Sequence, residues 1–229
     1  MDNKHLQARK AGFAYLALVI TGMTALMYIP TQLIDWESAS TTFSNIQDNE
    51  LLFRLGIFSE VLMLLAFIAL AYFLYDMLHK VNPTHAVAMV VFVLLSIPIS
   101  LVNLTSKFLI LKLISQTGIV ELSELHSQVM VYLESYFAGL NISNVFWGIW
   151  LFPFGYLVWH SGFLPKFFGF FLMAGAVGYF LSFSLDLLWA GFNESMVKTI
   201  VDIPSQIGEL GICLWMTVAG ARTFSLKKK

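Results

Sequence analysis

The sequence predicts an all-α fold: a polytopic membrane helix bundle with six transmembrane helices and both termini in the cytoplasm. Three observations lead to this prediction. Apolar residues make up 58% of the 229 residues and charged residues only 12%, against about 45–50% and about 25% in soluble domains. The apolar residues gather in six stretches close to the roughly 17–25 residues that a helix needs to cross a bilayer. Basic residues concentrate in alternate connections between these stretches.

The six predicted spans take up most of the chain. They comprise residues 11–29, 52–77, 86–111, 135–159, 167–189 and 204–221. The first span follows a basic start, but it is long for a signal peptide, and Tyr28-Ile29-Pro30 lacks a small-residue cleavage site. We therefore interpret it as a retained helix. Because little sequence remains outside the spans, residues 1–229 are expected to form a single membrane-embedded helical domain.

The charges in the connections orient the predicted bundle. With alternate crossings, nine basic residues fall on one side: Lys4, Arg9, Lys10, Lys80, Lys166, Arg222, Lys227, Lys228 and Lys229. The opposite connections, 30–51, 112–134 and 190–203, are mainly acidic. The positive-inside rule therefore places both termini in the cytoplasm.

One outer connection has a helical pattern of its own. Within 113–134, four apolar or aromatic residues fall near helical spacing: Leu122, Leu125, Val129 and Tyr132. This spacing favours an amphipathic helix that lies on the outer membrane interface.

Several classes of function find no support in the sequence. Cys213 is the only cysteine, so we expect no internal disulfide, Cys-x-x-Cys redox pair or cysteine-based zinc or iron–sulfur site. There is no His-Glu-x-x-His, Gly-x-Ser-x-Gly or phosphate-binding glycine loop, so no cofactor is expected. The net charge of −1 does not favour a nucleic-acid partner. Four residues near the cytoplasmic ends of the spans are weak candidates for a metal site: Asp76, His79, His85 and His160.

Polar residues inside the predicted spans are unevenly distributed. Counted from the outer span ends at 1.5 Å per residue, six of them lie about 5–14 Å deep, all in the outer half: Glu60, Asn103, Asn141, Asn144, Asp186 and Glu209. Arg54 and Lys107 lie nearer the same boundary. Polar groups that only joined helices would be spread over both halves. Since an intramembrane ionisable residue marks a functional site by default, these eight residues are the candidate binding site, an outward-facing polar pocket.

Helical spacing indicates where some of these side chains point. In the fifth span four residues recur every four positions and share one face: Ala174, Gly178, Ser182 and Asp186. Small residues on a face let helices approach closely, so this face is expected to point into the bundle. Arg54 and Glu60 lie on different faces of their helix, and Arg54 has Glu50 one turn before it. Arg54 therefore either pairs with Glu50 or extends to the interface, whereas Glu60 either pairs within the protein or binds a ligand.

Three blocks of the sequence resemble one protein family. They are "RKAGFAYLALVI" at 9–20, "LLFRLGIFSEVL" at 51–62 and "FWGIWLFPFGYLVWHSGFLPKFFGFFLMAGAVGY" at 146–179. These blocks are similar to a mainly bacterial family of uncharacterised integral membrane proteins, defined as domain of unknown function 4386, and the resemblance covers nearly the whole chain. The resemblance implies a multi-pass protein of the bacterial cytoplasmic membrane. It implies no activity and identifies no catalytic residue.

Three classes of function remain open. A binding or transport protein would use the polar pocket for a small solute, a cation or a proton, and we favour this class. A structural or regulatory membrane subunit would instead pair its buried charges and offer an apolar flank to another membrane protein or to a second copy of the chain. An intramembrane enzyme ranks behind these because no nucleophile or metal motif accompanies the acids, as does a lipid- or quinone-binding protein. The lipid bilayer is the one partner that every alternative requires.

Overall fold

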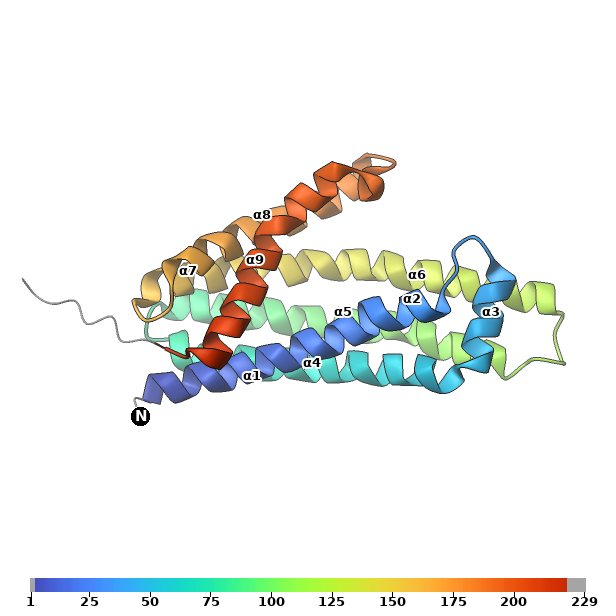
Figure 1. Cartoon of the computed structure of the whole chain (residues 1–229), viewed down its shortest axis with the longest axis horizontal. Coiled ribbons are helices and arrows are strands. Elements are labelled where there is room, and N and C mark those ends of the chain that lie inside the picture. The colour runs from blue at the N-terminus through green and yellow to red at the C-terminus, as the bar shows by residue number, and fades with distance from the viewer. Residues whose placement is uncertain (1–2, 222–229) are drawn as a thin grey trace, which may run out of the picture. The chain divides into compact units, whose positions relative to one another are not determined.

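The computed structural model confirms the all-α fold class. It describes residues 3–221, apart from the side chains of Asn3 and Glu194. These residues contain no β-strand, only an isolated bridge between Thr117 and Val120. Figure 1 shows the elements in chain order: α1 (Asn3–Met23), the π-helix η1 (Thr24–Tyr28), α2 (Ile29–Leu33), α3 (Ala39–Asp48), α4 (Glu50–Leu78), α5 (Pro83–Ile114), α6 (Leu122–Ile149), α7 (Leu151–Ser161), α8 (Lys166–Leu188), the 3₁₀ turn η2 (Phe192–Glu194) and α9 (Met196–Val218).

Five helical stretches among the described residues are long and apolar enough to cross a membrane. They are Lys4–Leu33, Glu50–Leu78, Pro83–Ile114, Leu122–Ser161 and Lys166–Leu188. Each of these stretches contains most or all of one of the first five predicted spans. The stretch Lys4–Leu33 combines α1, η1 and α2, and the stretch Leu122–Ser161 combines α6 and α7. The sixth predicted span, 204–221, lies largely within the amphipathic helix α9, which is not among the five. The chain therefore has the helices of a multi-pass membrane protein.

Helix α4 has one apolar face that is exposed and one that is buried. Leu55, Phe58 and Leu65 recur at helical spacing and are 49%, 59% and 57% exposed. Ile57 and Leu64 lie on the opposite side and are buried. An exposed apolar face of this kind suits contact with lipid chains, because lipid tails are as apolar as leucine.

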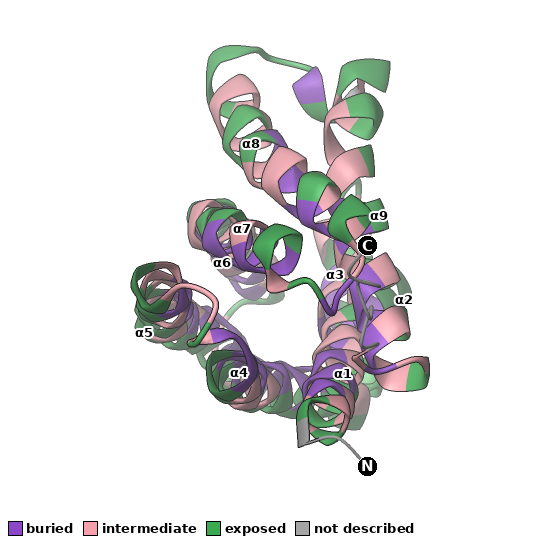
Figure 2. Ribbon diagram, turned by 90° about the vertical axis from the view of Figure 1, so that its left-hand side faces the viewer, coloured by how far each residue is buried: buried purple, intermediate pink, exposed green. Residues whose placement is uncertain are grey.

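The chain divides into two compact units, and the first contains the described parts of residues 1–16, 66–96 and 142–229. Its helices α7, α8 and α9 pack in succession, and Figure 2 shows buried segments along α8. Of its buried residues, Gly169 lies against α7, and Gly175 and Gly178 lie against α9. Glycine allows this approach: a Cβ atom added to Gly178 would lie 2.5 Å from the carbonyl oxygen of Val201. Gly178 therefore faces a neighbouring helix, as its place on the small-residue face predicted.

Two sequence features set the limits of α7 in this unit. The helix breaks at Trp150 because Pro153 has no N–H to bind the carbonyl of Ile149, four residues earlier. It ends at Gly162, whose φ of 72° is the left-handed conformation that glycine adopts most easily at helix C-termini. The turn after Gly162 leads directly into α8.

The second unit contains residues 17–65 and 97–141. Its core is formed by buried apolar side chains of α2 to α6: Ile29, Leu33, Phe43, Ile46, Phe53, Ile57, Leu104, Ile110, Leu113, Ile114, Leu125, Val129 and Leu133. Helix α3 is capped at its start by Ser38, whose hydroxyl accepts the N–H of Thr41 at 3.2 Å. The sequence analysis did not predict this helix. Its buried residues Phe43 and Ile46 attach it to the core.

The prediction of an interfacial helix within 113–134 was wrong. Helix α6 begins at Leu122 and continues without a break to Ile149. Leu125 and Val129, which the spacing placed on an interfacial helix, are fully buried in the core of the second unit. The helical period was recognised correctly, but the apolar face packs against protein.

Candidate functional site

A buried ion pair joins two of the predicted site residues within the second unit. Lys107 Nζ on α5 donates a hydrogen bond to Glu60 Oε2 on α4 at 2.7 Å. Glu60 is 1% exposed and Lys107 is 5% exposed. A single charge in such surroundings costs several kcal/mol, and each of these two charges compensates the other. The pairing explains how two helices that are otherwise apolar can hold an acid and a base.

Tyr136 and Asn103 complete what we call the Glu60 cluster (Glu60, Asn103, Lys107 and Tyr136). The Tyr136 hydroxyl donates to the same Glu60 Oε2 at 2.7 Å, and Lys107 Nζ lies 4.0 Å from the centre of the Tyr136 ring. Asn103 Nδ2 donates to the backbone carbonyl of Tyr136 at 2.9 Å. A Cβ atom on Gly139 would overlap the Asn103 amide, so glycine is required for this contact. Side chains of α4, α5 and α6 thus meet at one carboxylate.

The second oxygen of Glu60 has a different environment. Oε1 is buried and has no hydrogen-bond partner among the described residues. A cavity of about 20 Å³ lies beside the cluster, lined by Lys107, Tyr136 and mainly apolar residues such as Ile29 and Phe137. A cavity needs about 10–15 Å³ to admit one water molecule, so this one is water-sized and too small for an organic solute.

Glu209 is held in the first unit by two tyrosine hydroxyl groups. Tyr15 of α1 donates to Oε2 at 3.0 Å, and Tyr179 of α8 donates to Oε1 at 3.2 Å. Tyr15 is 1% exposed, and Glu209 itself is half-buried. Both oxygens of Glu209 therefore have neutral donors, whereas Glu60 has a cation and a hydroxyl on one oxygen.

Asp186 takes part in a polar group where α8 and α9 meet η2. It accepts a hydrogen bond from the Asn193 side chain and is partly exposed. One turn earlier, the Ser182 hydroxyl donates to Asp202 at 2.8 Å, and Asp202 also pairs with Lys198 at 3.1 Å. These contacts connect the ends of the two helices.

The remaining candidates lie in more open surroundings. Arg54 pairs with Glu50 at 2.6 Å, which is the one-turn pairing that the sequence offered as an alternative, and both side chains are exposed. Asn141 is exposed and Asn144 is half-buried. The structure therefore brings together Glu60, Lys107 and Asn103 from the predicted set. The convergence of Glu60, Asp186 and Glu209 on one pocket remains a prediction.

The residues considered for a metal site have other contacts. In the described part of the chain, no group of three or more His, Cys, Asp or Glu side chains is arranged to hold a metal ion. His85 stacks on Tyr156 with 3.9 Å between ring centres. The Asp76 carboxylate accepts a hydrogen bond from Gln7 at 2.7 Å.

Sequence analysis did not identify the three tyrosines that bind these acids. Tyr136 shares a helical face with Gly139 and Ser143, three and seven residues later, and this small-residue face could have marked it. Tyr15 likewise follows the buried residues Ala8 and Ala11 at helical spacing. Tyr136 lies 76 residues from Glu60 in the sequence, and Tyr15 lies 194 residues from Glu209. Both contacts therefore depend on the tertiary fold.

Comparison with known protein families identifies the family of the chain. A family model described as domain of unknown function (DUF4386) matches residues 10–220. The chain belongs to this family. The matched region includes every residue of the Glu60 cluster and all the residues around Glu209, so both sites lie within the family domain. No curated protein and no solved structure matches the chain.

Proposed function

We propose that this DUF4386 protein is a multi-pass protein of a bacterial cytoplasmic membrane that takes up a proton or small cation at Glu60. The proposal is based on the burial and the hydrogen bonding of the Glu60 carboxylate. Glu60 is almost fully buried on a membrane-capable helix, and its Oε2 binds Lys107 and Tyr136. Its Oε1 is buried and has no hydrogen-bond partner in the part of the chain that the structure describes. Ionisable residues at such positions commonly serve ion pathways and proton relays.

The size of the site favours the proton over other cations. A magnesium or calcium ion takes about six to eight oxygen ligands, whereas the cavity beside the cluster holds only about 20 Å³ and is lined mainly by apolar residues. A proton requires no such shell and could arrive through one water molecule in that cavity. A protonated Glu60 would no longer balance the charge of Lys107, so proton uptake would loosen the contact between α4 and α5. This gives the cluster two alternative states.

The same ion pair supports a second candidate, a structural or regulatory membrane subunit. In that case Glu60 and Lys107 stay ionised under all working conditions and only hold α4 against α5. The two functions therefore differ in whether Glu60 ever exchanges a proton.

Infrared difference spectroscopy on the protein in lipid nanodiscs distinguishes them. On acidification we expect a carboxylic C=O band from Glu60, because its buried Oε1 can accept a proton. The band should be missing in Glu60→Gln and present in Glu50→Gln, a control on the same helix whose side chain is exposed. A spectrum of Glu60→Gln identical to that of the unaltered protein would leave only the structural role.

We further propose that α9 forms a sixth crossing, so that both termini lie in the cytoplasm. The support is the charge distribution of the connections together with five membrane-capable helices. The single cysteine, Cys213, is buried and can be replaced by alanine for labelling experiments.

A membrane-impermeant thiol reagent applied to intact cells then tests this topology. Ile119→Cys and Met196→Cys are expected to react from outside, because both positions are exposed and lie in the stretches 112–134 and 190–203 that the charge pattern places outside. Thr84→Cys and Lys166→Cys should react only after the cells are opened. Ala221→Cys, beyond the end of α9, should likewise react only in opened cells. Its reaction in intact cells would contradict a sixth crossing by α9, and reaction of Met196→Cys only in opened cells would contradict the orientation of the bundle.

A further inference from the structure

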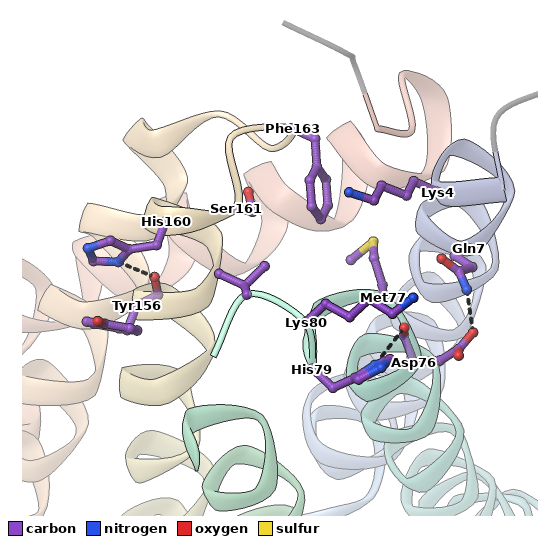
Figure 3. A pocket seen from close by; sticks show the side chains of 11 residues that line it. Lys4, Gln7, Asp76, Met77, His79, Lys80, Tyr156, His160, Ser161 and Phe163 are labelled. Atoms are coloured by element: carbon purple, nitrogen blue, oxygen red, sulfur yellow. Dashed lines mark hydrogen bonds between the residues drawn. The ribbon is translucent and has the colours of Figure 1, made fainter. Parts of the chain in front are cut away.

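A larger pocket lies within the first unit, among the ends of three helices (Figure 3). Its volume is about 660 Å³, within the range of about 300–1,000 Å³ that small-molecule sites occupy. The start of α1, the end of α4 with its following turn, and the end of α7 with its following turn form the walls. The polar residues that matter are Lys4, Gln7, Asp76, His79, Lys80 and His160.

Positive charge prevails in this pocket. Lys4 and Lys80 are both exposed and line it from different helices. Asp76 is the one carboxylate in the lining, and the Gln7 amide already donates to it at 2.7 Å. Figure 3 shows the Lys4 ammonium beside the Phe163 ring, 4.8 Å from its centre, which holds that lysine over the pocket. The lining thus offers two ammonium groups against one carboxylate that is already engaged.

The two histidines are oriented so that one ring nitrogen remains for a ligand. His79 Nδ1 lies 3.0 Å from the carbonyl of Tyr75, and His160 Nδ1 lies 2.9 Å from the carbonyl of Tyr156. A carbonyl can only accept, so each Nδ1 carries the hydrogen and Nε2 is left over. Both rings lie at the C-terminal ends of helices and line the pocket. When protonated, they donate to an anion through Nε2.

The length of α4 places this pocket among lipid headgroups. A helix of 29 residues is about 43 Å long at 1.5 Å per residue. The hydrocarbon core is about 30 Å thick, and the bilayer with its headgroup regions about 40–45 Å. A crossing helix of this length therefore ends in the headgroup layer, and the pocket lies at its C-terminal end. The buried side chains of Met77 and Phe163 add an apolar part to the lining.

We propose that this pocket binds the phosphate group of an anionic lipid. Lys4 and Lys80 supply the charge, and His79 and His160 supply further donors. Basic pockets between membrane helices on the cytoplasmic side are suited to such headgroups, because they combine counter-charge with a place beside the acyl chains. The proposal is independent of proton uptake at Glu60, which belongs to the other unit.

Thermal unfolding of the detergent-purified protein, with lipid added, tests the site. Phosphatidylglycerol is expected to raise the melting temperature more than phosphatidylcholine, whose headgroup has no net charge. In the double variant Lys4→Gln/Lys80→Gln, the apparent affinity for phosphatidylglycerol should fall about thirtyfold, since each lysine contributes about a factor of five. The control Lys10→Gln/Lys166→Gln removes two exposed lysines outside the lining and should retain the affinity.

A substitution that is expected to strengthen binding separates a loss of charge from a loss of folding, because a misfolded variant would bind lipid more weakly. Asp76→Asn removes the one negative charge of the lining and should strengthen phosphatidylglycerol binding severalfold. If inorganic phosphate stabilised the protein as much as phosphatidylglycerol does, the pocket would bind phosphate, but its ligand would be a soluble phosphate compound and not a lipid. Unchanged binding in Lys4→Gln/Lys80→Gln, an equal loss in the control, or weaker binding in Asp76→Asn would overturn the proposal.

Discussion

Replacement of Lys107 with methionine is expected to lower the free energy of unfolding by about 3–5 kcal/mol, because it leaves the Glu60 carboxylate buried without its cation. Tyr136 alone would then hold a group that is 1% exposed. Methionine has nearly the length of lysine, so the change removes charge more than volume. Unfolding by denaturant titration in bicelles measures the loss.

Two further variants show whether the ion pair is the cause. In Lys107→Met/Glu60→Gln the uncompensated charge is gone, and most of the stability should return. Arg54→Met breaks the exposed pair with Glu50, whose side chains are 55% and 41% exposed, and should cost only about 0–1 kcal/mol. A double variant as unstable as Lys107→Met would mean that packing at position 107, rather than charge, accounts for the loss.

Replacement of Gly178 with leucine is expected to cost at least about 1–3 kcal/mol, the usual range for an overfilled contact between packed elements. Here a Cβ atom would lie 2.5 Å from the backbone oxygen of Val201, and backbone cannot rotate away as a side chain can. Helices α8 and α9 would have to separate. Thermal unfolding of the purified variant in detergent measures the effect.

Val177→Leu is the matched control for this substitution. The adjacent Val177 is 54% exposed, so the same new residue should change the melting temperature little. Equal melting temperatures for Gly178→Leu and Val177→Leu would show that close approach at Gly178 does not stabilise the pair of helices.

Hydropathy located the helices well where lipid requires a continuous apolar stretch. The predicted spans 52–77 and 167–189 differ from α4 and α8 by no more than two residues at either end. Agreement is poorer where helices pack against protein. The predicted span 135–159 misses the first turns of α6, because buried Leu125 and Val129 alternate there with polar residues that lower the hydropathy. Helix α3 was missed for the same reason.

The sequence predicted which charged and amide residues belong to the candidate site, but it did not predict which of them are in contact. Glu60, Asn103 and Lys107 are noticeable in the sequence because charged and amide side chains are expensive in a membrane helix. Their partners depend on how helices are arranged, and Glu60 and Lys107 are 47 residues apart. Tyr136 was overlooked because tyrosine is common near membrane interfaces and residue type alone does not mark it.

The pairing of Glu60 with Lys107 has a consequence for biogenesis. A lone charge at the centre of a spanning helix costs about 2.5–3.5 kcal/mol when the helix passes from the translocon into lipid. Helices α4 and α5 are consecutive and are joined by the short turn 79–82, so the acid and the base can meet before either is exposed to lipid. Insertion as a hairpin neutralises both charges at once, whereas insertion one helix at a time leaves Glu60 unpaired until α5 has been synthesised. The ion pair that holds the finished fold together thus also favours release of these two helices into the bilayer as a single unit.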